Sequence, residues 1–395
     1  MLTRRTTLAF LTLAAVSLVP QGLFAQQHSK VIDLTKPNAP LLRFYIGTYT
    51  KGDSKGIYAS DLNLHDGTLL PPRLVAEIEN PSFLVTTPDR KNLYAVGEIS
   101  NFADQDTGAV SAFAIEEDGS LRLINQEASG GRGPCHVSLP RSKNFVMVSN
   151  YGGGSFATLP LGEEGQLAPA TSLFLHEGSS INEGRQKGPH GHGMYLVPGS
   201  LLALSVDLGL DKVMIYRILD PKTGEMELND PPFISVKPGS GPRHLAMNEL
   251  GTRVYLLNEL DSTLDVYAFD PSTGASEHLQ RVATLPEDFV GNNTTAEVYI
   301  HPRGQWLYCS NRGDDSIVTF RIDHETGLVL PIDRTSTFGK TPRHFQITPD
   351  GRYLLVANQD TNNIVVLEID QKIGTLKTTG NQILVPNPCC IEFLP

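Results

Sequence analysis

The chain has 395 residues and a formal net charge of −11, with 36 Gly and 27 Pro residues. The acidic balance and the lack of a Lys/Arg-rich run exclude a nucleic-acid-binding protein, because phosphate backbones are bound through basic patches. A small anionic ligand is still compatible with this charge, since a few basic residues inside a cleft can set the local potential.

The N-terminal segment has the features of an export signal. Arg4 and Arg5 precede an apolar run over residues 8–19, and Ala25 is a small residue before a cleavage site, so we predict a signal peptide over residues 1–25. The run is too short to span a bilayer by itself. The arginine pair indicates twin-arginine export, although Thr7 departs from that signal, and ordinary secretion or an uncleaved anchor remains open.

The segment that follows, residues 26–41, is polar and contains Pro37 and Pro40, so we predict a linker there. We expect an exported mature protein, periplasmic or extracellular, with no membrane span after cleavage of the signal.

The first predicted strands cover residues 43–49, 56–62 and 74–78, and a short phrase, often Gly-Pro, then recurs along the chain. Its seven anchors lie at residues 81, 134, 189, 242, 295, 342 and 388, so neighbouring anchors are 46 to 55 residues apart. Propeller blades repeat at about 40–50 residues, and helical repeats are shorter. We therefore predict an all-β, seven-bladed β-propeller over residues 42–395.

The two ends of the predicted propeller complete each other. Three strands precede the first anchor and one strand follows the last, at residues 390–393. We predict that this C-terminal strand is the innermost strand of the N-terminal blade, which closes the ring and leaves no open edge. A closed ring needs no partner chain, so we expect a monomer. Within each blade we expect strands that alternate between buried and exposed residues.

The longest insertion, residues 175–188, precedes the third anchor and carries Glu177, Glu183, Arg185 and Lys187 among glycines. Long loops in compact domains are often functional. Two interpretations remain open for it, a lid over one end of the ring and a solvated surface loop.

Strand direction brings two sets of polar residues to one rim of the ring. Each innermost strand begins there, and the second strand returns to it. The strand starts contribute Ser82, His136, His190, His192, Arg243, His244, Glu297, Arg343, His344, Cys389 and Cys390. The second-strand ends contribute Glu98, Asn150, Asp207, Glu259, Asn311, Arg312 and Asn358. Since equivalent positions carry different residues, the rim has the pattern of a shaped site.

Several of these residues have a structural interpretation as well. His244 and His344 can satisfy backbone carbonyls as part of the repeat, and the Asn residues can cap turns. His190 and His192 resemble a metal pair but need a third ligand, such as Asp207 or Glu259, and we predict no metal and no cofactor. The four cysteines, Cys135, Cys309, Cys389 and Cys390, are expected to be free thiols.

The chain resembles the seven-bladed β-propeller lactonase family, which includes bacterial 6-phosphogluconolactonases and the fungal carboxymuconate cyclase. The resemblance covers the chain after about residue 42. It rests on Gly133-Pro134-Cys135-His136, Gly188-Pro189-His190-Gly191-His192, the segments 206–213 and 255–263, Gly241-Pro242-Arg243-His244 and Thr341-Pro342-Arg343. It implies a small-molecule lactone substrate and either hydrolysis, as in a 6-phosphogluconolactonase, or lactone formation by a cycloisomerase. A non-catalytic exported binding platform is a third possibility.

Opening a lactone requires a base, donors for the developing oxyanion and cations for an anionic tail. We expect Glu297 or Glu259 as the base, with a neighbouring histidine as alternate acid or base. The expected catalytic residues are Glu297, Glu259, Arg243, His136 and His192. The expected substrate-binding residues are Arg343, His190, Asp207, His244 and His344.

Overall fold

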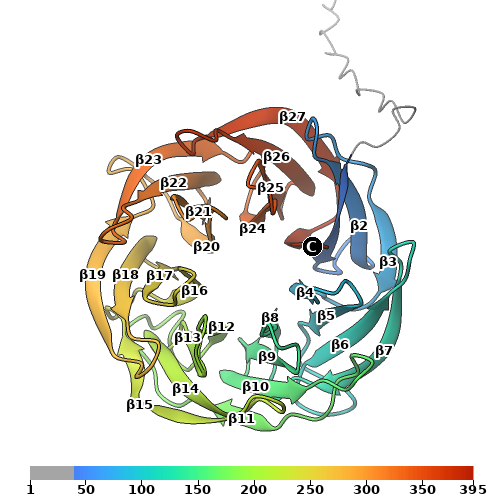
Figure 1. Cartoon of the computed structure of the whole chain (residues 1–395), viewed down its shortest axis with the longest axis vertical. Helices are drawn as coiled ribbons and strands as arrows, with labels where there is room; N and C mark the ends of the chain where they lie inside the picture. Colours follow the sequence, from blue (N-terminus) through green and yellow to red (C-terminus); the bar gives the residue numbers. More distant parts are fainter. Residues whose placement is uncertain (1–39, 395) are drawn as a thin grey trace, which may run out of the picture. The chain divides into compact units, whose positions relative to one another are not determined.

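The computed structural model describes residues 40–394, so the predicted signal peptide and most of the predicted linker lie outside the described residues. The described part of the chain contains 28 β-strands, in seven four-stranded antiparallel sheets. Figure 1 shows the sheets as seven blades around a common centre. The predicted seven-bladed β-propeller is confirmed. Among residues 40–394, no helix is long and apolar enough to cross a membrane.

Each blade contributes one strand to each of four concentric positions. The innermost strands are β28 (Pro388–Phe393), β4 (Leu84–Thr86), β8 (Pro134–Ser138), β12 (Gly191–Leu196), β16 (Pro242–Met247), β20 (Thr294–Ile300) and β24 (Pro342–Ile347). The second strands are β1 (Leu41–Thr48), β5 (Asn92–Gly97), β9 (Phe145–Asn150), β13 (Leu202–Asp207), β17 (Arg253–Asn258), β21 (Trp306–Arg312) and β25 (Tyr353–Asn358).

The two outer positions follow the same order around the ring. The third strands are β2 (Gly56–Asn63), β6 (Ala109–Ile115), β10 (Ser155–Pro160), β14 (Lys212–Asp220), β18 (Thr263–Phe269), β22 (Ser316–Ile322) and β26 (Asn363–Ile369). The outermost strands are β3 (Arg73–Glu77), β7 (Leu121–Ala128), β11 (Ser172–Leu175), β15 (Glu225–Ser235), β19 (Ser276–Ala283), β23 (Val329–Ser336) and β27 (Leu376–Leu384).

The ring closes as predicted, between the two ends of the propeller. β28 pairs with β1 in an antiparallel register that sets Phe393 opposite Phe44 and Ile391 opposite Ile46. The sheet order is β28-β1-β2-β3, so the C-terminal strand is the innermost strand of the N-terminal blade. No innermost strand is left without its blade.

The hydrophobic core consists of seven layers, one between each pair of neighbouring blades. A blade in the ring is covered on both faces, so its second strand is buried at every residue in β9, β13 and β25. The expected alternation of buried and exposed residues is therefore wrong for these strands. It survives in outermost strands such as β27, which face solvent.

Asparagines at the ends of second strands join neighbouring blades. Asn150 Nδ2 donates to the carbonyl oxygen of Ser129 at 2.9 Å, and Asn358 Nδ2 donates to that of Thr337 at 3.0 Å. Each acceptor follows the outermost strand of the preceding blade. These side chains are structural, as the interpretation of the asparagines as backbone-bonding residues anticipated.

Candidate active site

Most innermost strands carry a β-bulge where they begin. In β16, Pro242 pairs with Asn258 and His244 with Leu257, which leaves Arg243 as an extra residue. The corresponding extra residues in β8, β12, β24 and β28 are Cys135, His192, Arg343 and Cys389. A bulge redirects side chains that would otherwise alternate between faces. Arg243 and His244 consequently stay together, with Nη1 of Arg243 3.4 Å from both ring nitrogens of His244.

The central side chains fall into two groups. The rim layer comprises the five extra residues named above. The deep layer comprises Phe83, His136, His244, Glu297 and His344. The deep layer is held together by ring contacts, with the ring centroid of Phe83 4.5 Å from that of His136 and 5.4 Å from that of His344.

A cavity of about 290 Å³ opens at the rim layer. We call it the rim cavity, and it is lined by Glu98, Cys135, Tyr151, Arg185, His192, Glu259, Thr294, Arg312 and Arg343. Its volume lies at the low end of the roughly 300–1,000 Å³ of typical ligand pockets, so one small molecule fits.

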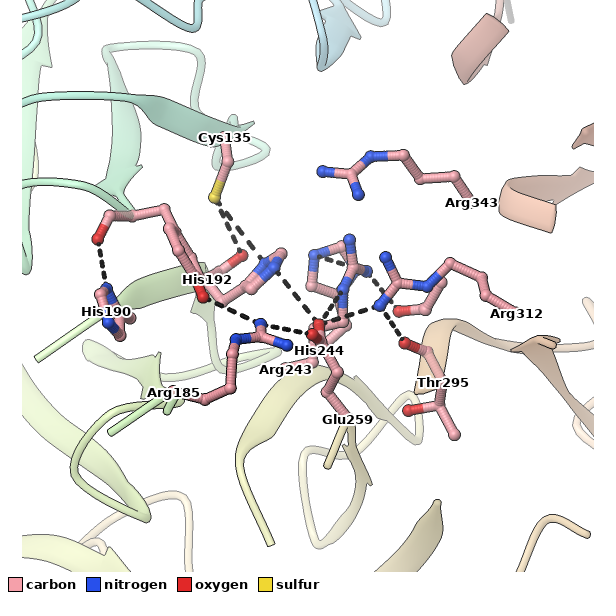
Figure 2. A network of polar contacts seen from close by, with 12 residues as sticks. Cys135, Arg185, His190, His192, Arg243, His244, Glu259, Thr295, Arg312 and Arg343 are labelled. Atoms are coloured by element: carbon pink, nitrogen blue, oxygen red, sulfur yellow. Dashed lines mark hydrogen bonds and ion pairs between the residues drawn. The ribbon is translucent and has the colours of Figure 1, made fainter. Parts of the chain in front are cut away.

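Glu259 lies at the centre of the polar network in the rim cavity (Figure 2). Its Oε1 accepts from Nη2 of Arg185 at 2.7 Å, and its Oε2 lies 3.1 Å from Nε of Arg243 and 3.0 Å from Nη2 of Arg312. The three arginines come from a loop, from β16 and from β21, so one carboxylate connects three separate parts of the ring.

The arginines fix the charge of Glu259. Burial alone would raise the pKa of Glu259, but Arg312, Arg243 and Arg185 outweigh it and hold the pKa at about 2. Burial also lowers the pKa of Arg312, to about 10, which still leaves this guanidinium charged at neutral pH. A carboxylate with so low a pKa is a weak base, and the three ion pairs favour a role for Glu259 in holding the arginines in place over the expected role of base.

His192 faces the rim cavity as a neutral imidazole. Burial, with Arg243 and His244 nearby, lowers the pKa of His192 well below its ordinary value. Its Nε2 lies 3.8 Å from Oε2 of Glu259, and its Nδ1 lies 3.7 Å from Sγ of Cys135. An uncharged ring at this position can exchange hydrogen bonds with a bound hydroxyl group.

Glu98 reaches the rim cavity from the end of β5, on the other side of the ring from β17 and Glu259 (Figure 1). The Oε2 atom of Glu98 accepts from the hydroxyl groups of Tyr49 at 2.8 Å and Ser82 at 2.5 Å. Tyr49 in turn accepts from Nη2 of Arg343 at 2.7 Å. Tyr49 therefore links Arg343 to Glu98.

Glu297 lies in the deep layer and does not line the rim cavity. Its carboxylate lies 2.9 Å from Nδ1 of His244 and 3.5 Å from Nε2 of His344, and it is 4 % exposed. Burial raises the pKa of Glu297 and lowers those of His136, His244 and His344. Within residues 40–394, neither His244 nor His344 donates to a backbone carbonyl: Nδ1 of His244 pairs with Glu297, and Nδ1 of His344 accepts from the amide of Ile391.

The structure separates His190 from His192. The ring of His190 stacks on Tyr151, with centroids 4.4 Å apart, and its Nδ1 donates to the carbonyl oxygen of Tyr151 at 2.9 Å. Asp207 is fully buried and bonds Nδ1 of His176 at 2.7 Å and the amide of His190 at 2.9 Å. Both residues support the wall behind the rim cavity, and neither lines it.

The long insertion before β12 forms part of this wall. Ser180 Oγ donates to Asp211 at 2.5 Å, and Gln186 Nε2 donates to the carbonyl oxygen of Leu208 at 2.8 Å. These bonds fix Arg185, whose Nη2 donates to both Tyr151 and Glu259. The loop thus holds the guanidinium group of Arg185 at the rim cavity.

Among residues 40–394 no group of three or more His, Cys, Asp and Glu side chains is arranged to hold a metal ion. All four cysteines are buried and free, as expected.

Comparison with known proteins identifies the family. The family model described as "Lactonase, 7-bladed beta-propeller" matches residues 43–393. The chain belongs to this lactonase family. It is 32 % identical to a 6-phosphogluconolactonase of Bacillus subtilis, over 89 % of this chain and 97 % of the relative. It is 34 % identical to a 6-phosphogluconolactonase of Formosa agariphila, over 77 % and 85 %.

A solved structure of a family relative matches the whole ring. The periplasmic gluconolactonase of Pseudomonas aeruginosa superimposes with a TM-score of 0.84 and 32 % identity, covering 90 % of this chain and 99 % of that one. The match spans the complete propeller, so the two chains share the seven-bladed architecture.

Six residues that line the rim cavity are not among the expected catalytic or binding residues: Glu98, Cys135, Tyr151, Arg185, Thr294 and Arg312. Arg312 and Glu98 had been placed at the correct rim from strand direction alone, and Arg185 had been noted in the insertion. Tyr151 directly follows β9, whose last residue, Asn150, was expected at the rim. Position along the repeat thus carried the signal, but nothing in the sequence says which rim side chains turn inward.

Proposed function

We propose that this protein hydrolyses a small polyhydroxy lactone to its hydroxy acid inside the rim cavity. Membership of a lactonase family and two relatives named 6-phosphogluconolactonase support lactone hydrolysis. The observation that carries the proposal is the gathering of Arg185, Arg312 and Arg343 in the lining of one small cavity, with Arg243 paired to the cavity residue Glu259.

The formal charges in the cavity favour an anionic ligand or an anionic transition state. Three lining arginines, Arg185, Arg312 and Arg343, lie with two lining carboxylates, Glu259 and Glu98, while His192 is neutral. Arg243, which pairs with Glu259, adds a fourth positive charge next to the cavity. The cavity is therefore positive inside a chain whose net charge is −11. Such a local excess attracts anionic substrates and stabilises negative charge that develops on an oxygen.

The arginines divide the work of binding and catalysis in this proposal. Arg312, which lines the cavity and is held by Glu259, stabilises the oxyanion that forms when water adds to the lactone carbonyl, and the charge of Arg243 behind Glu259 adds to the positive potential there. Arg185 and Arg343 bind the hydroxyl-rich or anionic end of the substrate, with His192 as a hydrogen-bond partner. The C–O bond of the ring then breaks, and the hydroxy acid leaves as a carboxylate.

The remaining expected site residues act from behind the cavity. His136, His244, His344 and Glu297 form the deep layer that supports Arg243 from below. Asp207 and His190 hold the start of β12, which carries His192.

We also propose that the mature protein is exported and monomeric. The predicted signal peptide and the relative named as periplasmic support export. N-terminal sequencing of protein recovered from a periplasmic extract should give a mature start near residue 26, and light scattering should give the mass of one chain. An exported location favours an unphosphorylated sugar lactone.

Proton release measured at constant pH tests the activity. The purified protein is mixed with gluconolactone, 6-phosphogluconolactone or a muconolactone, with and without EDTA, and spontaneous hydrolysis is subtracted. Hydrolysis that survives EDTA is the expected result. Turnover of the muconolactone alone would favour the cycloisomerase, and no turnover of any lactone would favour a binding platform.

A further inference from the structure

Glu98 differs from Glu259 in how its oxygens are used. Both hydrogen bonds to the carboxylate, from Tyr49 and Ser82, go to Oε2. Among residues 40–394, no donor contacts Oε1. The residue lines the rim cavity, so one oxygen of a carboxylate is oriented by two hydroxyl groups while the other stays available to a ligand.

No arginine forms an ion pair with Glu98 in the described part of the chain. Arg343 contacts Tyr49, 2.7 Å from its hydroxyl group, and Tyr49 contacts Glu98. Burial raises the pKa of Tyr49 well above its ordinary value, so its hydroxyl group remains a donor. Glu259, by contrast, forms ion pairs with three arginines. Glu98 is therefore the cavity carboxylate with one oxygen, Oε1, outside any hydrogen bond or ion pair within residues 40–394.

We propose that Glu98 is the general base of the lactone hydrolysis described above, on which this inference rests. Oε1 takes a proton from a water molecule, and the water oxygen forms a bond to the lactone carbonyl carbon. The oxyanion collapses, the bond between this carbon and the ring oxygen breaks, and the ring oxygen receives the proton back from Glu98. Tyr49 is a positioning residue, since it orients Oε2 and links Glu98 to Arg343.

The positions of Glu98 and Glu259 around the ring suit a base on one side of the substrate and cations on the other. Glu98 directly follows β5, and Glu259, which pairs with three arginines, directly follows β17 on the other side of the ring (Figure 1). A lactone between them meets a base on one face and the guanidinium group of Arg312, which lines the cavity, on the other. This is the arrangement that addition of water to a carbonyl requires.

The test compares Glu98→Gln with Glu77→Gln, an exposed glutamate on β3. The amide oxygen of Gln can still accept from Tyr49 and Ser82, so the fold is preserved. We expect kcat to fall about 100-fold or more in Glu98→Gln, with KM changed less than about threefold. The Glu77→Gln protein should match the wild type.

Chemical rescue separates a base from a structural residue. In Glu98→Ala, added formate should enter the vacated space and restore part of kcat, measured relative to wild type at the same formate concentration. Glu98→Gln should show no rescue, because its amide fills the space.

The outcomes distinguish this inference from the proposed function. If the wild type hydrolyses a lactone but Glu98→Gln retains its kcat, or Glu98→Ala loses activity without rescue, Glu98 is not the base although the protein is a lactonase. If the wild type hydrolyses no lactone, the proposed function fails together with this inference.

Discussion

Glu259 is the residue on which the arrangement of the rim cavity depends. Replacing it by Gln leaves Arg185, Arg243 and Arg312 without their shared counter-charge in a buried site. We expect Glu259→Gln to lower the free energy of unfolding by about 3–5 kcal/mol, as for other broken buried ion pairs. Denaturant titration measures this, with Glu277→Gln on the exposed face of β19 as control.

The pH dependence of this effect has a defined sign. The folded pKa of Glu259, about 2, lies below the ordinary value of 4.5. Its contribution to stability is therefore present above pH 4.5 and is lost as the pH falls towards 2. The difference between wild type and Glu259→Gln should shrink over that range, and a difference that grows on acidification would contradict the account.

Glu297→Gln should affect turnover only moderately. Glu297 contacts His244 and His344 below the cavity, so it acts on Arg243 through other side chains. We expect kcat to stay within about tenfold of the wild type, measured by proton release. A loss as large as that in Glu98→Gln would return Glu297 to the role of general base.

Strand direction predicts one common rim for the polar residues but does not assign their roles. The structure places His192, Glu259 and Arg343 in the lining of the rim cavity, whereas Glu297, His190 and Asp207 do not line it. Glu259 and Glu297 were both expected as bases because each is an acidic residue at the correct end of a strand. The role of Glu259 depends on arginines from two blades and a loop, and that of Glu297 on its depth in the channel. Both follow from three-dimensional neighbours that the repeat pattern does not specify.

Among the structural elements, the loop between β11 and β12, residues 176–190, contains the long insertion and is held in place by hydrogen bonds. Asp211 accepts from Ser180 of this loop and from the amide of Gly241 at 2.7 Å, and thereby ties the loop to the start of β16. Asp211 has a φ of 51°, a conformation that Asn tolerates, so Asp211→Asn removes the carboxylate without backbone strain.

Asp211→Asn should loosen the loop and displace Arg185. We expect faster amide hydrogen exchange within residues 176–190 and a KM raised about threefold or more, with kcat little changed. The exposed variant Asp288→Ala serves as control. Unchanged exchange in the loop would show that Asp211 does not hold it.

The blades were predictable from the sequence, and the bulges were not. The spacing of the anchors and the runs between them gave all seven sheets. A bulge depends on the pairing register between two strands, as at Arg243 and Arg343. The consecutive Arg-His pairs are the sign of the bulge in the sequence, since both residues turn towards the centre. The same pairs are explained equally well by the repeat structure.

For the whole molecule, the strand that closes the ring contains a carboxyl group with a shifted pKa, that of Glu392. Glu392 of β28 accepts from the amide and hydroxyl of Thr86 at 2.9 Å and from Nε2 of Gln346 at 3.1 Å, and so joins the blades on either side of the closure. Burial raises the pKa of Glu392 to about 7. The counting of strands predicted this closure, but not the carboxylate that spans it.

The free energy of unfolding should fall as Glu392 ionises. Because the folded pKa lies above the ordinary value of 4.5, the contribution of Glu392 is intact below pH 4.5 and is lost as the pH rises through about 7. Relative to Glu392→Gln, the wild type should lose roughly 1–3 kcal/mol of stability between about pH 5 and pH 9. Denaturant titrations at both pH values measure it, and parallel changes in the two proteins would contradict it.

The propeller has a second, larger cavity of about 560 Å³ near the turns at residues 248–252 and 301–304, away from the rim cavity. Arg303 lines that cavity and is exposed, whereas Arg343 lines the rim cavity. The two residues allow the location of the reaction to be tested with the same substitution at each site.

Whether the reaction takes place in the rim cavity is tested by kcat/KM for lactone hydrolysis by Arg343→Ala and Arg303→Ala, measured beside the wild type. Reaction in the rim cavity predicts a loss of about 100-fold or more for Arg343→Ala and a change below about threefold for Arg303→Ala. Full activity in Arg343→Ala, or its loss in Arg303→Ala, would place the chemistry elsewhere.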